Sequence, residues 1–167
     1  MDIITIIQLI SAVFIPLQLF FVYKQVKIAQ NQMNENRELS KTDATLKIIG
    51  EYSNLISELD NNLIEKMKLL SLKSNDFSTN EINALLSDIS NRKQLFILCD
   101  YFERLSLGII SECLDEEMVY AQMAPTLITN FDNLNAYIFI RRNEAKSNIC
   151  GNFEYLANKW KKRQLNQ

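Results

Sequence analysis

The stretch Ile3–Tyr23 reads IITIIQLISAVFIPLQLFFVY and holds twenty-one residues without one charged side chain. As an α-helix rising about 1.5 Å per residue, it matches the roughly 30 Å hydrocarbon core of a bilayer. Its Ile, Leu, Phe and Val residues favour insertion strongly enough to outweigh the few polar ones. The stretch therefore predicts one transmembrane helix over residues 3–23, with a buried core helix of a soluble protein as the alternative.

The charges around this stretch predict its orientation. No Lys or Arg precedes it, whereas Lys24 and Lys27 follow it closely. Because basic residues that flank a span stay on the cytoplasmic side, we expect the N-terminus outside and the remaining chain in the cytoplasm. The run lacks the basic start and the small-residue cleavage site of a signal peptide, so we expect an uncleaved anchor. Three widely spaced cysteines without a CxxC pair agree with a reducing compartment.

Polar side chains of the span recur at alternating steps of three and four residues, which places them on one face of a helix. In lipid, amides and hydroxyls gain by hydrogen bonding to a neighbouring helix, so this face predicts self-association. Two alternatives remain: the face lines a channel, or each amide bonds to its own helix or to water. The polar face and its extension beyond the span comprise Gln8, Ser11, Gln18 and Gln25.

Three Gly, two Pro and no His in 167 residues exclude several classes of protein. A sandwich, a barrel, a doubly wound sheet and a glycine-rich phosphate loop all need more turn residues. Without His, the commonest general base and a leading metal ligand are missing. We therefore expect an all-α protein, in which a helical juxtamembrane stalk over 24–41 joins the anchor to a cytosolic bundle of four or five helices over 42–165.

Local signals divide this bundle into segments of apolar residues at helical spacing. Ser78 with Glu81 has the spacing of a capping box, and Asp115 followed by two Glu has the pattern of an N-cap with an acidic first turn. Pro125 predicts a kink or a break in its helix. Cys99 lies on the most apolar segment, which predicts a core position. The expected helices cover residues 42–70, 78–90, 91–114, 115–142 and 147–164.

Basic residues are concentrated at the C-terminal end, where residues 141–167 hold seven basic residues and two acidic ones. A basic cluster around Trp160 suits the surface of an anionic membrane. The alternative is a solvated helix end with Trp160 closing the core. The net charge of −2 argues against nucleic acid as a partner. The predicted membrane-surface residues are Lys24, Lys27, Lys159, Lys161, Lys162 and Arg163.

Two carboxylates, Asp100 and Glu103, share one helix face, and facing pairs of this kind could hold a divalent metal or perform acid–base chemistry. Helical carboxylate sites of the di-iron kind add a Glu-x-x-His motif, which a chain without His cannot supply. We therefore expect no metal, no cofactor and no catalytic residue. We expect Glu103 to pair instead with Arg104 of a neighbour, or with Arg141 and Arg142, and so to hold the helix register.

Five short motifs lie in the predicted cytosolic helices. They are YFERL at 101–105, GII at 108–110, DEEMVY at 115–120, RR at 141–142 and NFEYL at 152–156. Together they resemble a bacterial domain-of-unknown-function family, over a layout of residues 1–162. The resemblance implies a small bacterial protein with one N-terminal anchor and a helical cytosolic domain, and it implies no reaction, substrate or cofactor. The motif residues singled out are Phe102, Glu103, Asp115, Arg141, Arg142, Phe153 and Glu154.

These features favour a membrane-anchored helical interaction or regulatory module of the bacterial inner membrane, without enzymatic activity. We expect the anchor to form a homo-oligomer and the acidic helical body to recruit an unidentified protein partner in the cytoplasm. Abundant Ile, Lys and Asn suggest an AT-rich gene, which is compatible with a phage-defence or mobile-element system. Two alternatives stay open: a membrane-disrupting effector whose pore is lined by Gln8, Ser11 and Gln18, and a carboxylate-dependent enzyme built on Asp100 and Glu103.

Overall fold

The computed structural model describes residues 2–59, 63, 65 and 84–166, and within α1 the side chains of residues 4–13 and of Pro16 also lie outside the described part. These residues form helices and contain no strand, so the prediction of an all-α protein is confirmed. The chain divides into two units, Met1–Ser40 and Lys41–Gln167. The described helices are α1 (Ile3–Glu58), α4 (Ile89–Ile110), α5 (Glu116–Ala145) and α6 (Gly151–Leu165).

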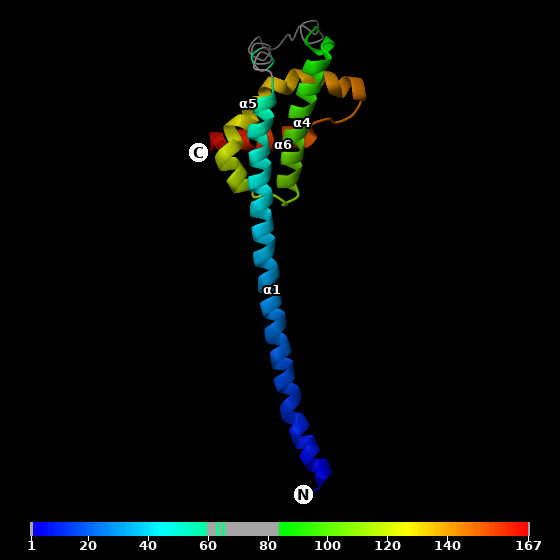
Figure 1. The fold of residues 1–167 in the computed structure, drawn as a ribbon, viewed down its shortest axis with the longest axis vertical. Helices are drawn as coiled ribbons and strands as arrows, with labels where there is room; N and C mark the ends of the chain where they lie inside the picture. Colours follow the sequence, from blue (N-terminus) through cyan, green and yellow to red (C-terminus); the bar gives the residue numbers. More distant parts are fainter. Residues whose placement is uncertain (1, 60–62, 64, 66–83, 167) are drawn as a thin grey trace. The chain divides into compact units, whose positions relative to one another are not determined.

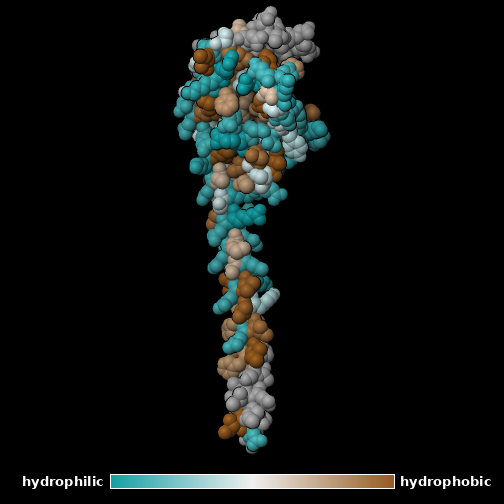
Figure 2. Space-filling model, turned by 90° about the vertical axis from the view of Figure 1, so that its right-hand side faces the viewer, coloured by the Kyte–Doolittle hydropathy of each residue, from teal (hydrophilic) through white to brown (hydrophobic). Residues whose placement is uncertain are grey.

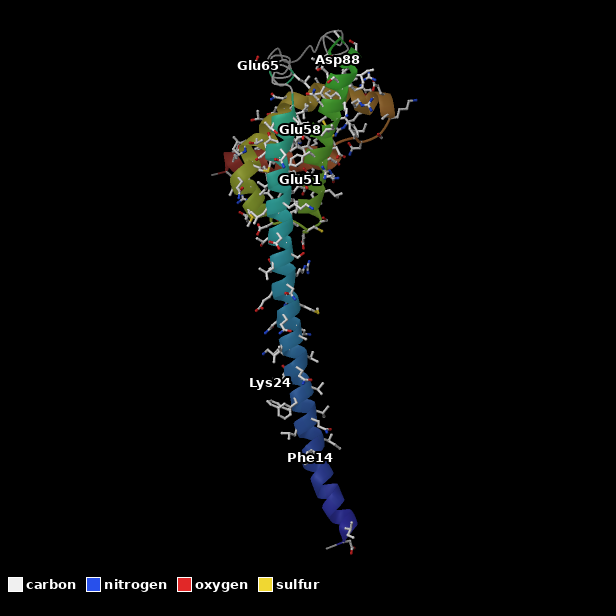
Figure 3. All side chains as sticks on the ribbon, viewed as in Figure 1. Phe14, Lys24, Glu51, Glu58, Glu65 and Asp88 are labelled. Carbon is white, nitrogen blue, oxygen red and sulfur yellow. The ribbon has the colours of Figure 1, made fainter. Side chains whose placement is uncertain are left out.

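The first unit is the N-terminal part of α1, and Figure 3 labels Phe14 and Lys24 on it. Residues 17–49 contain neither Gly nor Pro, so no strong helix breaker interrupts this stretch. Residues 24–41 are helical, as predicted, and their role as a juxtamembrane stalk stays a prediction. The predicted helix start at Thr42 is wrong, because α1 passes through that position.

In the second unit, α4, α5, α6 and the last turns of α1 surround one hydrophobic core (Figure 1). α6 packs against both α4 and α5. Phe153 of α6 stacks on Phe102 of α4 with 4.8 Å between the ring centroids, and it meets Phe131 of α5 edge-on at 5.3 Å. Phe102, Phe153 and Trp160 are fully buried. Ring pairs of this kind stabilise the junction of three helices beyond the apolar area that they bury.

The last turns of α1 join this core through one face. Ile48, Ile49 and Tyr52 pack against the core, whereas Leu46 on another face is 52% exposed. The Tyr101 hydroxyl of α4 donates a hydrogen bond to the Ile48 carbonyl at 2.9 Å. This contact and the aromatic ring of Tyr52, 5.5 Å from that of Tyr101, fix which face of α1 turns inward.

α4 begins at Ile89, two residues before the predicted start at residue 91. Asp88 is the N-cap of α4 and accepts a hydrogen bond from the Ser90 backbone N–H at 2.8 Å. The predicted boundary between helices 78–90 and 91–114 is therefore wrong by a few residues. The capping box at Ser78 lies outside the described residues.

α4 ends at Ile110, four residues earlier than predicted, because the chain turns sharply behind it. Glu112 adopts a left-handed conformation with φ 59°. The backbone N–H groups of Cys113 and Leu114 then both donate to the Gly108 carbonyl, at 2.9 Å and 3.0 Å. A Cβ on Gly108 would lie 2.6 Å from Leu114 Cδ1, so a larger residue at this position would have to displace the Leu114 side chain.

α5 begins at the predicted N-cap and continues through Pro125. Asp115 is its N-cap and accepts a hydrogen bond from the Met118 backbone N–H at 3.0 Å, as the sequence predicts. Pro125 lies inside the helix, which continues through it to Ala145. A break at Pro125 is therefore excluded, and packing of the buried residues on either side of it outweighs the hydrogen bond that proline cannot make.

Candidate functional site

A pocket of about 120 Å³ lies between α4, α5 and the turn that precedes α6. It brings together three side chains that the sequence analysis singled out, Asp100, Glu103 and Arg141, and adds others that it did not. Burial raises the pKa of Tyr137 to about 12, so its hydroxyl stays protonated at neutral pH. The polar and thiol side chains in its wall are Cys99, Asp100, Glu103, Tyr137, Arg141 and Cys150.

Glu103 acts as the cap of α6. Its carboxylate accepts hydrogen bonds from the backbone N–H groups of Asn152 at 3.2 Å and Phe153 at 2.8 Å, and from the Asn152 side-chain amide at 2.9 Å. The first turn of a helix has unpaired N–H donors and a partial positive charge, which a carboxylate neutralises. The predicted pairing of Glu103 with Arg141 and Arg142 is therefore wrong, because these arginines pair with Glu144 and Glu154, while pairing with Arg104 of a neighbour stays a prediction.

The start of α6 explains why a residue from another helix supplies this cap. We expected the helix to begin at residue 147, but Lys146 and Cys150 both adopt left-handed conformations, with φ 50° and 58°. Cys150 occupies the N-cap position and its side chain makes no cap hydrogen bond. The N–H groups of the first turn therefore depend on Glu103, which reaches them from α4.

The neighbouring charges are paired locally. These pairs leave Asp100 and Glu103 in separate contacts, and the described part of the chain holds no group of three or more Cys, Asp or Glu placed to bind a metal ion. The ion pairs are Arg104 Nε with Asp100 Oδ2 at 3.0 Å, Arg141 Nη1 with Glu144 Oε2 at 2.6 Å, and Arg142 Nη1 with Glu154 Oε2 at 2.8 Å.

Arg142 connects the end of α5 to the start of α6. Its Nε donates to the Ile149 carbonyl at 2.8 Å, while its Nη1 pairs with Glu154. The turn between the two helices is thus held from both sides, by Arg142 of α5 and by Glu103 of α4.

The other motif residues form the core and a helix cap. Phe102 and Phe153 stack on each other inside the bundle, and Asp115 begins α5. The Asp115 backbone N–H also donates to the hydroxyl of Thr45 at 2.9 Å, which ties α5 to α1. The motif residues therefore lie at the joints of the bundle, which are the places where α1, α4, α5 and α6 contact one another.

Two thiols face each other in the pocket wall. Cys99 is 4% exposed, which confirms its predicted core position, and its thiol is hydrogen-bonded to that of Cys150. The hydrogen bond and burial raise the pKa of Cys99, whereas the same hydrogen bond lowers the pKa of Cys150. All three cysteines are free thiols. No sequence signal predicts the pair, because Cys99 and Cys150 come from distant parts of the chain.

Three of the four basic residues predicted to form the cluster on α6 make ion pairs with acidic residues of α5. Trp160 is fully buried and donates from Nε1 to Glu116 at 3.0 Å. This arrangement matches the alternative of a helix end whose tryptophan closes the core, and the membrane-surface role of the cluster stays a prediction. Lys162 is exposed. The ion pairs of the other three are Lys159 with Glu116, Lys161 with Asp132, and Arg163 with Glu117.

These contacts also set the charge of two acids at the start of α5. Although partial burial opposes it, hydrogen bonds from Lys159 and Trp160 lower the pKa of Glu116. The hydrogen bonds and charge of Arg163 lower the pKa of Glu117. Both carboxylates are therefore ionised at neutral pH and hold α6 on α5.

Apolar side chains on the N-terminal part of α1 are exposed, and Figure 2 shows several of them in brown along this helix. Phe14, Leu19 and Tyr23 are 57%, 65% and 66% exposed. Within the part of the chain whose side chains are described, no helix has a stretch both long and apolar enough to cross a membrane. Much of the predicted span, residues 4–13, lies outside that part.

The polar face predicted for self-association is described only in its second half. Gln18 and Gln25 are exposed on α1, as are Lys24 and Lys27. The side chains of Gln8 and Ser11 lie outside the described residues.

Comparison with known proteins places the chain in a family. No curated protein and no solved structure matches it. A family model described as a domain of unknown function, DUF4760, matches residues 3–160, which include α1 and all the joints described above. The predicted resemblance to a domain-of-unknown-function family is confirmed, while the membrane anchor and the bacterial source stay predictions. Because the match extends over nearly the whole chain, this protein belongs to the DUF4760 family.

Proposed function

We propose that this chain is a membrane-anchored helical interaction module, with residues 3–23 crossing the membrane once, the N-terminus outside and the second unit in the cytoplasm. The observation that carries the proposal is the exposure of apolar side chains along α1, from Phe14 to Tyr23. Burying a large apolar side chain is worth about 1.5–3 kcal/mol. A bilayer would cover these side chains on every side of the helix, and the uncharged run ends where the first basic residue, Lys24, begins.

Two features of the second unit support the interaction role: the contacts of its candidate catalytic acids and its exposed aromatic side chains. Asp100 and Glu103, the acids on which an enzyme would depend, are occupied by an ion pair and a helix cap. Large aromatic side chains are instead exposed: Phe96, Phe139 and Tyr155 are 58%, 64% and 59% exposed. Exposed aromatic residues are typical of surfaces that bind other proteins.

The test compares two pairs of lysine substitutions on α1. Phe14→Lys with Leu17→Lys places two charges within the span, at side chains 57% and 48% exposed. Val26→Lys with Ile28→Lys places two charges beyond Lys24, at side chains 50% and 52% exposed. A charged residue near the centre of a span costs about 3 kcal/mol, so the first pair should release the chain from membranes at alkaline pH. The matched second pair should leave it in the membrane.

A C-terminal reporter that is active only in the cytoplasm tests the orientation, and it should be active in bacteria. Equal extraction of the two lysine pairs would contradict the anchor, because a water-exposed helix tolerates both pairs alike. Activity of a reporter that works only outside the cytoplasm would contradict the orientation. Release of a small dye from liposomes that carry the purified chain would favour the pore over the interaction module.

A further inference from the structure

The two thiols in the pocket wall differ from ordinary buried cysteines because they contact each other across two elements. Cys99 lies in the middle of α4, and Cys150 lies in the turn before α6. They are 4% and 5% exposed, so protein covers both, yet both line the pocket of about 120 Å³. This pocket therefore gives a small reagent a route to both thiols.

The surroundings of the two thiols are unequal. Cys150 is the N-cap residue of α6. The hydrogen bond from Cys99 and the guanidinium of Arg142 favour its thiolate, whereas burial and the Glu103 carboxylate oppose it, and the pKa of Cys150 is lowered. Cys99 lies in the core, donates its proton toward Cys150 and is disfavoured as a thiolate by burial. Cys150 is therefore the better nucleophile, and Cys99 is placed to react second.

We propose that Cys99 and Cys150 form a redox-active dithiol, which is oxidised to a disulfide by a low-molecular-weight disulfide that enters the pocket between α4, α5 and the start of α6. The proposal stands on the pocket wall that both thiols line and on their position between α4 and the turn before α6. It does not depend on the proposed membrane anchor.

The reaction proceeds by two thiol–disulfide exchanges. The Cys150 thiolate attacks one sulfur of the small disulfide, so that a mixed disulfide forms and one small thiolate leaves. Cys99 then loses its proton and attacks the Cys150 sulfur, which forms the bond between the two cysteines and expels the second small thiolate. The protein loses two electrons and two protons, and the small disulfide is reduced to two thiols.

The product would change the joint that Glu103 holds. A disulfide needs the two sulfurs about 2 Å apart, which is closer than any hydrogen-bonded contact, so the Cys150 side chain or the turn that carries it moves toward α4. Glu103 grips Asn152 and Phe153 directly after that turn. Oxidation is therefore expected to shift the start of α6 against α4.

The experiment uses the purified full-length chain in mild detergent, fully reduced and then freed of reductant. Bis(2-hydroxyethyl) disulfide is the probe, because each half is small enough to reach the pocket. Intact mass and peptide mapping follow the products. In the wild-type chain we expect a Cys99–Cys150 crosslink with loss of two hydrogens. Cys113→Ser, which removes the exposed third cysteine, is the matched control and should form the same crosslink.

Single variants separate the two roles. Cys99→Ser should stop at a mixed disulfide on Cys150, and Cys150→Ser should modify Cys99 about tenfold more slowly. Equal rates in these two folded variants would overturn the assignment of the nucleophile. If a variant loses its helical circular dichroism, the peptide map of the wild-type chain still shows whether the Cys99–Cys150 disulfide forms. Reaction of Cys113 alone, with Cys99 and Cys150 remaining reduced thiols, would overturn the proposal.

Discussion

Removing the Glu103 carboxylate should loosen α6 from the bundle. Glu103→Ala deletes three hydrogen bonds of 2.8–3.2 Å and leaves the first-turn N–H groups of α6 without their cap. A hydrogen bond to a charged group contributes about 1.5–3 kcal/mol, and the loss of a helix cap costs about 1 kcal/mol. Because water reaches this half-buried site and replaces part of the loss, we expect a destabilisation of about 3 kcal/mol. For a chain of this size the melting temperature should fall by about 10 °C.

Trp160 provides the assay, since it is the only tryptophan and lies fully buried on α6. Its fluorescence during thermal unfolding of the full chain in detergent reports the docking of this helix. Glu103→Gln keeps the shape of the side chain but turns an amide N–H₂ toward a donor. Its destabilisation should therefore be more than half of that expected for Glu103→Ala. Asp100→Ala is the matched control: it removes a solvent-exposed ion pair one turn earlier on α4 and should cost less than about 0.5 kcal/mol. Equal effects of Glu103→Ala and Asp100→Ala would refute the capping argument.

Three further experiments test other parts of the structure. Gly108→Ala should destabilise the bundle by about 1–3 kcal/mol through the close contact at that position, whereas Gly50→Ala, with open space around it, should stabilise α1 by about 0.5–1 kcal/mol; thermal unfolding of both would contradict this if the signs agreed. The folded-state pKa of Glu116 is lowered, so its stabilisation is present above the ordinary value of 4.5 and is lost as the pH falls through the folded-state pKa. Glu116→Gln should therefore lower the melting temperature at pH 7 and by much less at pH 3, and a deficit independent of pH would count against the ion pair. Gln8→Leu with Gln18→Leu should weaken crosslinked self-association by roughly ten- to thirtyfold at unchanged membrane level, and crosslinking equal to that of the wild-type chain would show that these amides make no contact between helices.

Local features of the sequence predicted local features of the structure correctly. The scarcity of Gly and Pro and the apolar residues at helical spacing indicated an all-α chain, and the described residues are helical without strands. The N-cap at Asp115 was predictable because its partner, the Met118 N–H, is three residues away. The core position of Cys99 followed from the apolar residues around it on the same helix.

The predictions that failed depended on how the chain turns back on itself or packs between helices. The start of α6 was placed at residue 147, because nothing near it reveals that Lys146 and Cys150 turn left-handed. The end of α4 was placed too late, because the close approach at Gly108 arises only when Leu114 folds back on it. The break considered at Pro125 does not occur, since the packing of neighbouring core residues decides whether a proline ends a helix.

The sequence by itself determined the helical class, the uncharged stretch at residues 3–23 and the caps supplied from within a few residues, because propensity, charge and capping act over a few residues along the chain. Only the tertiary structure decided the partners of Glu103 and the pairing of Cys99 with Cys150. The sequence position of a carboxylate or a thiol does not indicate which distant group it will contact. Their neighbours follow from the packing of α4 against α6, where the stacked rings of Phe102 and Phe153 set the approach of the two helices.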